Sequence, residues 1–393
     1  MPGSLFTTAA QANQAFLSQF TSGGTLASIQ QATNGAFVPP NVFGFPSTFY
    51  QPTYYKWNFE IQRELGWKTL MSVNYNGMHG IHIPIDDNGL NAYCPTTVCP
   101  GGFAGLPTAV PNASFGVVNQ ILSAGTSNYN GLTVSLRRAV AAGLTFNLNY
   151  TWSHALDDVS NGGLLPLNAL QTDTSLLNPQ NPYNIRGNYG NSDLDVRHYV
   201  SLGWVYSDAF RHSGFHWGPN RVFSGWTLSG NTFYRTGLPF TVIDNNATTT
   251  LAGFNYGAGA TIFGTSLTNN LAGCGAGAVN VPCLTTSEFA PSNANPTGFG
   301  LLGRNGFRGP GFFDMDLSLL KDFAITERFK VTVGAQAFNL LNHPNFDQPV
   351  NDVANPLFGS ITRLVGPPTS ILGSFVAGND SPRFVELKAE FHF

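Results

Sequence analysis

The sequence predicts an all-β protein, a transmembrane antiparallel β-barrel with long external loops. Segments that alternate apolar and polar residues recur along the chain, and each is about nine to eleven residues long, the length that a tilted membrane strand needs. Aromatic residues gather at the ends of these segments, as in the girdles of membrane barrels. The polar positions are mostly Asn, Thr, Ser and Gln, which suits a hydrated lumen.

The composition excludes several other classes of protein. Of the 393 residues, 10% are charged and 13% are aromatic, whereas soluble domains carry roughly 25% charged residues. The net charge of −3 gives no basic stripe for binding nucleic acid. No run of about 18 apolar residues predicts a membrane helix, and the first residues lack the basic and apolar regions of a signal peptide.

The last strand shows the alternation most clearly. Val385, Leu387, Ala389, Phe391 and Phe393 are apolar, and the residues between them are polar or charged. A period of two places the apolar set on one face of a strand. The same pattern predicts eight earlier strands within residues 55–65, 69–77, 132–138, 144–152, 198–206, 225–235, 312–320 and 329–338.

The connections between these strands alternate in length. Short turns join the first strand to the second, the third to the fourth and the seventh to the eighth. The long connections, at about residues 77–128, 153–195, 236–309 and 342–382, are expected to be extracellular loops. We expect residues 1–54 to be a further extracellular, irregular segment and residues 55–393 to be the barrel domain.

Alternation alone also fits a soluble β-sandwich, whose apolar face points inward. Aromatic residues at both ends of the strands favour the membrane, because they occupy girdle positions at the two lipid–water interfaces. These residues are Trp57, Trp67, Trp152, Tyr206, Trp226, Tyr234 and Phe323.

A set of charged residues falls on the predicted lumen side of the strands. They could contact a passing ligand, but cross-strand ion pairs that keep the wall hydrated are the favoured interpretation. The set is Glu60, Arg137, Asp314, Asp316, Lys330, Glu386, Lys388 and Glu390.

Four cysteines form two local pairs in loops rich in Gly and Pro, Cys94 with Cys99 and Cys274 with Cys283. The spacing does not fit a zinc ribbon, so two loop disulfides in an oxidising compartment are expected, with free thiols as the alternative.

Loop acids offer a weaker signal. Asp157, Asp158, Asp173, Asp193 and Asp195 lie at the edges of one long connection and could hold Ca²⁺, but solvated loop acids are the favoured interpretation. Loop aromatics could capture a ligand by stacking. We expect no enzyme, no cofactor and no metal site, since no catalytic or nucleotide-binding pattern occurs. The loop aromatics considered are Tyr183, Tyr189 and Phe254.

Several phrases resemble the barrel of Oar-like TonB-dependent outer-membrane transporters, a family with a carboxypeptidase-regulatory-like domain. They are "WNFEIQRELGWKTLMSVNYNGMHGIHI" (57–83), "YNGLTVSLRRAVAAGLTFNLNYTWSHALDD" (129–158), "GRNGFRGPGFFDMDLSLLKDF" (303–323) and "FNLLNHPNF" (338–346). The resemblance implies the cell outer membrane of a Gram-negative-type bacterium. It also implies import of a bulky substrate of the oligosaccharide, peptide or siderophore class.

The same resemblance implies partners and a larger whole. The family has a plug domain, a TonB system that supplies energy and a barrel of about twenty-two strands, so this chain is expected to be a carboxy-terminal fragment. The lumen charges would then contact the plug. Outer-membrane lipid is a partner, and the closing Phe391 and Phe393 resemble the signal that the assembly machinery recognises. A structural or adhesive barrel without transport is the alternative function.

Overall fold

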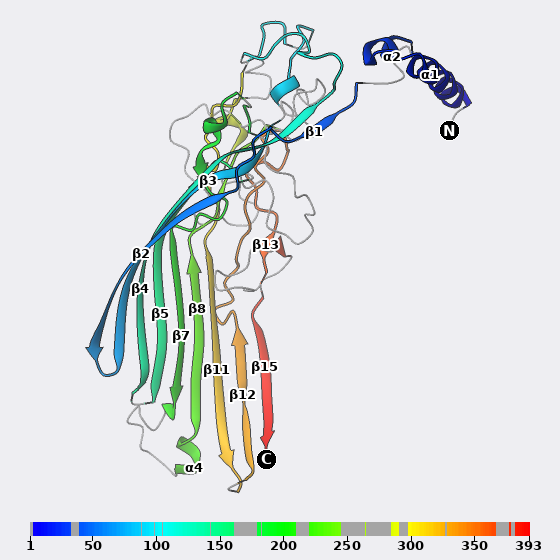
Figure 1. Cartoon of the computed structure of the whole chain (residues 1–393). Helices are drawn as coiled ribbons and strands as arrows, with labels where there is room; N and C mark the ends of the chain where they lie inside the picture. The colour runs from blue at the N-terminus through cyan, green and yellow to red at the C-terminus, as the bar shows by residue number, and fades with distance from the viewer. Residues whose placement is uncertain are drawn as a thin grey trace.

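One antiparallel sheet forms the body of the protein (Figure 1), as seen in this computed structural model. The structure describes residues 3–32, 39–87, 89–97, 99–103, 105–141, 143–160, 179–181, 183–209, 220–244, 264, 284–290, 298–326, 328–366, 377–378 and 382–393. The long strands are β2 (Thr53–Gly66), β3 (Thr69–Asp87), β4 (Val118–Ala141), β5 (Leu144–Asp157), β7 (His198–Ser207), β8 (Trp226–Arg235), β11 (Phe312–Ala324), β12 (Lys330–Phe338) and β15 (Phe384–His392).

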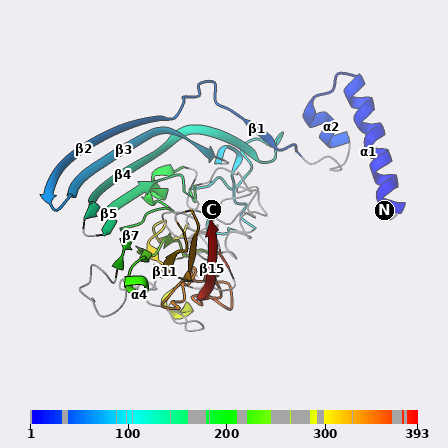
Figure 2. The same ribbon diagram turned by 90° about the horizontal axis from the view of Figure 1, so that it is seen from below.

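The sheet is an up-and-down meander. Its strand order is β15-β12-β11-β8-β7-β5-β4-β3-β2, so each long strand pairs with the next long strand along the chain. Two short strands join the sheet off this path, β1 (Val42–Gly44) against β4 and β6 (Gly190–Asn191) against β5. Figure 2 shows that the sheet is curved rather than flat. The predicted all-β antiparallel fold and its strands are confirmed.

The register gives the two faces of the sheet different chemical characters, one mainly apolar and the other mainly polar. Residues that face each other in an antiparallel pair project to the same side. Val331 pairs with Phe391 and Val333 with Ala389, while Thr332 pairs with Glu390 on the opposite side. The apolar face carries Phe59, Val73, Val134, Leu148, Leu202, Leu228, Leu319, Val333 and Leu387.

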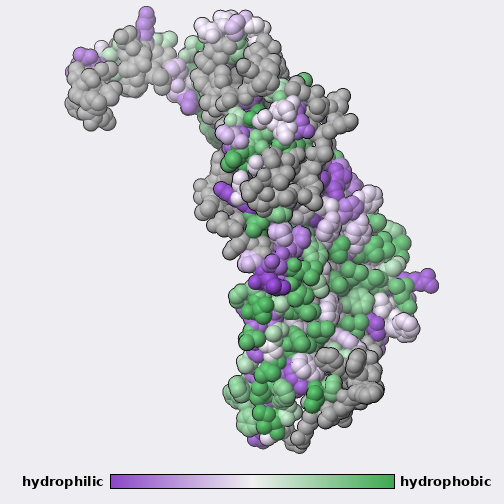
Figure 3. All heavy atoms as spheres, turned by 180° about the vertical axis from the view of Figure 1, so that it is seen from behind, coloured by the Kyte–Doolittle hydropathy of each residue, from purple (hydrophilic) through white to green (hydrophobic). Residues whose placement is uncertain are grey.

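The other side of the sheet is hydrophilic, and we call it the polar wall. It carries Glu60, Asn74, Thr133, Asn149, Ser201, Ser229, Ser318, Gln336 and Glu386. In Figure 3, a view from behind, hydrophobic residues gather over the lower part of the molecule and hydrophilic residues become frequent above it. An apolar face backed by a polar wall is the pattern of strands that separate lipid from water.

Tyrosines mark the upper end of the apolar face, on the side of the long loops. The Tyr75 hydroxyl donates to Asn130 Oδ1 at 2.7 Å, and the Tyr150 hydroxyl lies 2.9 Å from His198 Nδ1. Each ring therefore has an apolar body on the lipid side and a polar tip at the edge, the arrangement that interfacial aromatics adopt. We call this level the outer rim.

A lysine marks the lower end. Lys321 lies on the apolar face opposite Trp226, and its ammonium group lies 5.3 Å from the centroid of the Trp226 ring and 5.4 Å from that of Phe323. The same ammonium donates to the carbonyls of Val222 and Ser224, at the end of the short helix α4 (Asn220–Phe223). The charge is thus satisfied where the apolar face ends.

Strands β3 and β4 extend well beyond the outer rim, which the sequence did not predict. The loop expected at about residues 77–128 is partly strand, because β3 runs to Asp87 and β4 begins at Val118. Pairs such as Asp87 with Gln120 continue the ladder, with register shifts around Ile83. The two strands therefore project past the membrane band into the loops.

The amino-terminal segment is not irregular, which corrects the prediction for residues 1–54. It contains the helices α1 (Gly3–Thr21) and α2 (Leu26–Ala32) and the strand β1, and β2 already begins at Thr53. Figures 1 and 2 place α1 and α2 to one side, away from the sheet. Among the described residues, no helix is long and apolar enough to cross a membrane.

The described parts of the long connections gather at one end of the strands and the carboxy terminus lies at the other (Figure 1). We call the described parts of these connections the loop layer. It has apolar clusters of its own, one around Phe103 with Cys94 and Cys99, and a second made of Phe240, Val242, Leu284, Phe289, Phe307 and Phe358. Burial of these side chains gives the loops a packed core rather than a loose surface.

Candidate functional site

The pairing register places all the predicted lumen residues on the polar wall. Arg137 pairs with Asn147 and Asp316 with Asn231, each on the side that carries Glu60 and Glu386. The remaining members of the set, Asp314, Lys330, Lys388 and Glu390, fall at polar-wall positions of β11, β12 and β15. Whether they contact a plug or a ligand stays a prediction.

Neutral side chains link the strands across the polar wall. The Thr133 and Thr151 hydroxyls lie 2.9 Å apart, and the Ser135 hydroxyl donates to Asn149 Oδ1 at 2.7 Å. Asn58 Nδ2 donates to the side-chain oxygens of Asn74 and Asn76, on the neighbouring strand, at 2.9 and 2.6 Å. These bonds link side chains of neighbouring strands across the polar wall.

Ion pairs on the wall are few and lie near its lower end. Lys330 Nζ lies 2.7 Å from Asp322 Oδ2 across the β11–β12 pair, whereas Lys388 Nζ lies 2.8 Å from Glu390 Oε1 within one strand. All four side chains are about one third exposed or more, so solvent screens both pairs and neither contributes much to stability.

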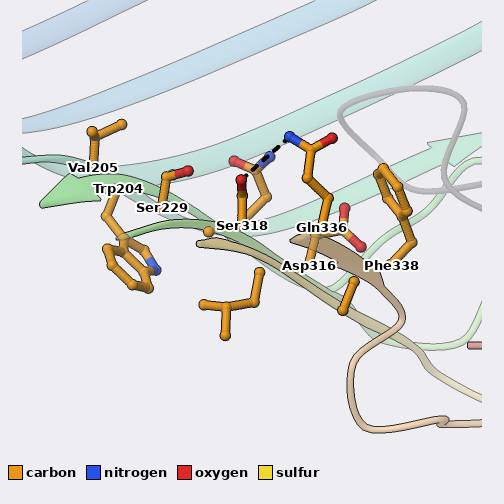
Figure 4. A pocket seen from close by; sticks show the side chains of 12 residues that line it. Trp204, Val205, Ser229, Asp316, Ser318, Gln336 and Phe338 are labelled. Carbon is orange, nitrogen blue, oxygen red and sulfur yellow. Dashed lines mark hydrogen bonds between the residues drawn. The ribbon is translucent and has the colours of Figure 1, made fainter. Parts of the chain in front are cut away.

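A hollow of about 390 Å³ interrupts the wall between β7, β8, β11 and β12. Figure 4 shows that Ser318 and Gln336 join across it, with Gln336 Nε2 donating to the Ser318 hydroxyl at 3.3 Å. Small residues make the hollow, since Gly203 faces Asn231 and Ser229 faces Ser318. The hollow is lined by hydroxyl, amide and carboxylate groups, including that of Asp316.

Above the wall, a buried arginine ties the loop layer to the sheet. The Arg304 side chain is fully buried, and its Nη2 lies 2.7 Å from Asp157 Oδ1 at the end of β5. Its Nε donates to the Asn188 carbonyl at 2.6 Å and its Nη1 to the Ser160 carbonyl at 3.1 Å. One guanidinium therefore joins three segments of the chain, as its planar fork of donors allows.

A second cluster lies beside the first. Asp195 is fully buried and accepts hydrogen bonds from Arg308 and from Arg197 Nε, the latter at 2.8 Å. Asn305 Nδ2 donates to Asp193 Oδ1 at 2.7 Å. The phrase "GRNGFRG" that contains Arg304, Asn305 and Arg308 is thus the part of the chain that organises the loop layer.

This finding corrects the interpretation of the loop acids as solvated groups. Asp157, Asp158 and Asp195 are buried, with 6%, 2% and 0% of their surface exposed, and Asp173 lies outside the described residues. Burial raises the pKa of Asp158, although both of its oxygens accept hydrogen bonds from Thr126. In the described part of the chain, no group of three or more His, Cys, Asp or Glu side chains is placed to hold a metal ion.

Cys94 and Cys99 are joined by a disulfide in the loop that links β3 and β4. Both are almost fully buried beside Phe103 and Leu106. The second predicted pair, Cys274 and Cys283, lies outside the described residues. Phe391 and Phe393, the predicted assembly signal, are 74% and 97% exposed at the free edge of the sheet.

Comparison with known proteins establishes the family. The family model described as the outer membrane beta barrel domain matches residues 2–371. The chain belongs to this family, and the protein is located in the cell outer membrane. No sequence among the curated proteins matches it.

Solved structures of outer-membrane transporters are also similar to the chain. The outer membrane transporter YddB from Escherichia coli matches with a TM-score of 0.42 and 9% identity over 90% of this chain and 34% of that one. The FrpB iron transporter from Neisseria meningitidis matches with a TM-score of 0.39 and 9% identity, over 93% of this chain and 33% of that one. The pyoverdine outer membrane receptor FpvA from Pseudomonas aeruginosa matches with a TM-score of 0.36 and 12% identity, over 86% of this chain and 30% of that one. The chain spans about a third of each, and similarity at this level carries no conclusion about activity.

Proposed function

We propose that this chain is a carboxy-terminal part of the barrel of a TonB-dependent outer-membrane receptor that imports a bulky substrate. One observation carries the proposal. Within the described residues, β2 and β15 end the sheet, each with a partner strand on one side only, while both present apolar residues to lipid.

Free strand edges cannot persist inside a bilayer. Each unpaired backbone N–H or C=O group in hydrocarbon costs several kcal/mol, so membrane sheets close on themselves. Nine long strands with two free edges therefore need further strands, and the resemblance of the sequence to Oar-like transporters suggests about twenty-two in all. A barrel of that size has a lumen wide enough for bulky cargo and for a plug.

The two parts of the site suit different steps of import. The packed loop layer offers a rigid outer surface for capture, and the polar wall offers a hydrated path for passage. Gating would fall to a plug driven by the TonB system, and the last strand would be recognised by the assembly machinery. Residues 55–393 would then be one partial barrel domain. Oligosaccharides, peptides and siderophores are the substrate classes that the resemblance implies.

An immunoblot of outer membranes tests this proposal. An antibody to the loop at residues 89–116 would be used on samples run with and without boiling. A band near ~100 kDa that shifts on boiling is expected for a closed barrel of about twenty-two strands with its plug. A band near 42.2 kDa that does not shift would contradict it. The short chain would then have to cover its edges in another way, and a structural or adhesive role would take its place.

A further inference from the structure

A cavity of about 780 Å³ lies beyond the outer rim and is separate from the polar wall. Its lining comes from the upper ends of β3 and β4 and from the 3-10 helix η2 (Ile185–Asn188), and comprises His79, Ile81, Ala124, Thr126, Asp158, Ile185, Arg186 and Tyr189. The lining includes both apolar residues (Ile81, Ala124, Ile185) and polar or charged ones, so the cavity suits a molecule with both characters.

The register shows which side of the sheet this cavity occupies. His79 pairs with Asn128 and follows the apolar-face residues Tyr75 and Gly77 at intervals of two. Thr126 lies two residues before Asn128 on the same face of β4. The cavity therefore opens on the lipid side of the sheet, outside the lumen.

Its lower edge lies just above the headgroup layer of the outer leaflet. His79 is four residues beyond Tyr75, about 13 Å along the strand. At the usual tilt of about 40° this is roughly 10 Å along the membrane normal. The polar layer on each side of a bilayer is about 5–8 Å thick, so the cavity begins a few ångströms beyond it, at the level of sugars that project from that layer.

Several polar side chains in the cavity are held in place by hydrogen bonds and can each form one more hydrogen bond to a ligand. His79 Nδ1 lies 3.1 Å from the Ser127 carbonyl and 2.7 Å from Asn128 Oδ1, two acceptors, so Nδ1 carries the hydrogen and Nε2 is left to accept. Asn128 Nδ2 in turn donates to the Tyr189 hydroxyl at 2.7 Å, which leaves the hydrogen of that hydroxyl to donate.

Arg186 supplies a positive charge that no neighbour cancels. Its side chain is exposed at the mouth of the cavity and makes no hydrogen bond or ion pair with any other described residue. Among the described residues that line the cavity, Asp158 is the carboxylate, and it is buried and already accepts from the backbone and hydroxyl of Thr126.

We propose that this cavity binds the phosphorylated sugar headgroup of a glycolipid of the outer leaflet. Arg186 pairs with the phosphate, because guanidinium groups bind phosphate through two parallel hydrogen bonds. His79 and Tyr189 bond the sugar hydroxyls, and the apolar side of the sugar ring lies over Ile81 and Ala124. The acyl chains then run down the apolar face past Tyr75. The proposal needs the sheet in the outer membrane but does not depend on transport.

Native mass spectrometry of the intact protein, extracted from outer membranes in a non-ionic detergent, tests the site. The probes are lipid A, which is a phosphorylated glucosamine disaccharide lipid, dephosphorylated lipid A, and glucose 1-phosphate. We expect lipid A to bind about tenfold more tightly than its dephosphorylated form, the usual effect of one charge-assisted hydrogen-bonded pair.

Two variants at the site and one matched control complete the experiment. Arg186→Gln removes the charge and Ala124→Trp fills the cavity, and each should weaken lipid A binding about tenfold. Arg328→Gln neutralises an exposed arginine at the β11–β12 turn, far from the cavity, and should change nothing. A circular dichroism spectrum that matches that of the native protein shows that each variant is folded.

Three results would overturn the proposal. Equal binding of the two lipids would remove the role of the phosphate. Equal binding of glucose 1-phosphate and lipid A would show a site for free sugar phosphates instead of a lipid. Unchanged binding by folded Arg186→Gln and Ala124→Trp variants would show that the lipid binds elsewhere.

Discussion

Arg304 and Asp157 are 147 residues apart in the sequence, yet Arg304 Nη2 lies 2.7 Å from Asp157 Oδ1 in a buried contact. The pair joins the last long connection before β11 to the end of β5. The same guanidinium also donates to the carbonyls of Asn188 and Ser160, so one side chain links three segments of the loop layer.

Arg304→Gln should loosen the loop layer while the strands remain intact. Removal of one partner of a buried ion pair leaves an unpaired charge and costs about 3–5 kcal/mol. We expect faster cleavage of the external loops by an added protease in intact cells, with normal amounts of protein in the membrane. The exposed Arg328→Gln variant is the control. Equal cleavage of Arg304→Gln and the native protein would show that the pair does not hold the loops.

Asp158 predicts a pH dependence. Burial raises the pKa of the Asp158 carboxyl in the folded state above its value in the unfolded chain. The folded protein therefore binds this proton more tightly than the unfolded chain does. As the pH falls through the folded pKa towards the unfolded value, the free energy of unfolding increases. Asp158→Asn keeps a side chain that can bond to Thr126 but cannot ionise. We expect the variant to unfold at a higher temperature than the native protein at pH 7.5, and the difference to shrink at pH 4.5. A difference of the same size at both pH values would rule out this account.

We expect a charged substitution to destabilise the protein on the apolar face of β7 but not on its polar face. Leu202 lies on the apolar face and Ser201 on the polar wall. Leu202→Arg should cost about 2–4 kcal/mol, the penalty for a cation near the middle of the lipid face, whereas Ser201→Arg should cost little. The amount of heat-modifiable protein in outer membranes measures both. Similar losses for the two variants would contradict the assignment of faces.

The disulfide between Cys94 and Cys99 closes a short loop in a buried cluster. It should contribute about 2 kcal/mol to the stability of that loop by the chain-entropy estimate. Alkylation of the unreduced protein should leave both cysteines unmodified, and their peptides should gain alkyl groups only after reduction. Peptide mass spectrometry gives the answer, and alkylation of either cysteine before reduction would mean that the bond is absent in the membrane.

The sequence predicted the membrane strands well because each has a period of two that needs no information from elsewhere. In β5, Thr145, Asn147 and Asn149 alternate with apolar residues, and this alternation assigned each residue to the correct face of the sheet. The upper part of β3 was missed, since Pro84 argues against a strand and glycines interrupt the pattern. The helix α1 was missed because it has no charged residues and a weak apolar stripe.

The loop contacts could not be predicted in the same way. Arg304 and Asp157 are far apart in the sequence and are brought together only by the fold, so no local sequence pattern could predict that they pair. A signal was present nonetheless. A chain with only 18 Lys and Arg residues places two of them, Arg304 and Arg308, in one Gly-rich connection. Scarce charges in such a segment suggest defined partners, although they do not name them.

Labelling of single cysteines along β5 tests the central claim, that this sheet separates lipid from water in the outer membrane. Each position from 144 to 152 would be changed to cysteine in turn in a variant without the native cysteines. Intact outer membranes would then be treated with a charged maleimide. We predict labelling at Thr145, Asn147, Asn149 and Thr151 and protection at the positions between them. Labelling without this alternation, or alternation in the opposite sense, would contradict the account.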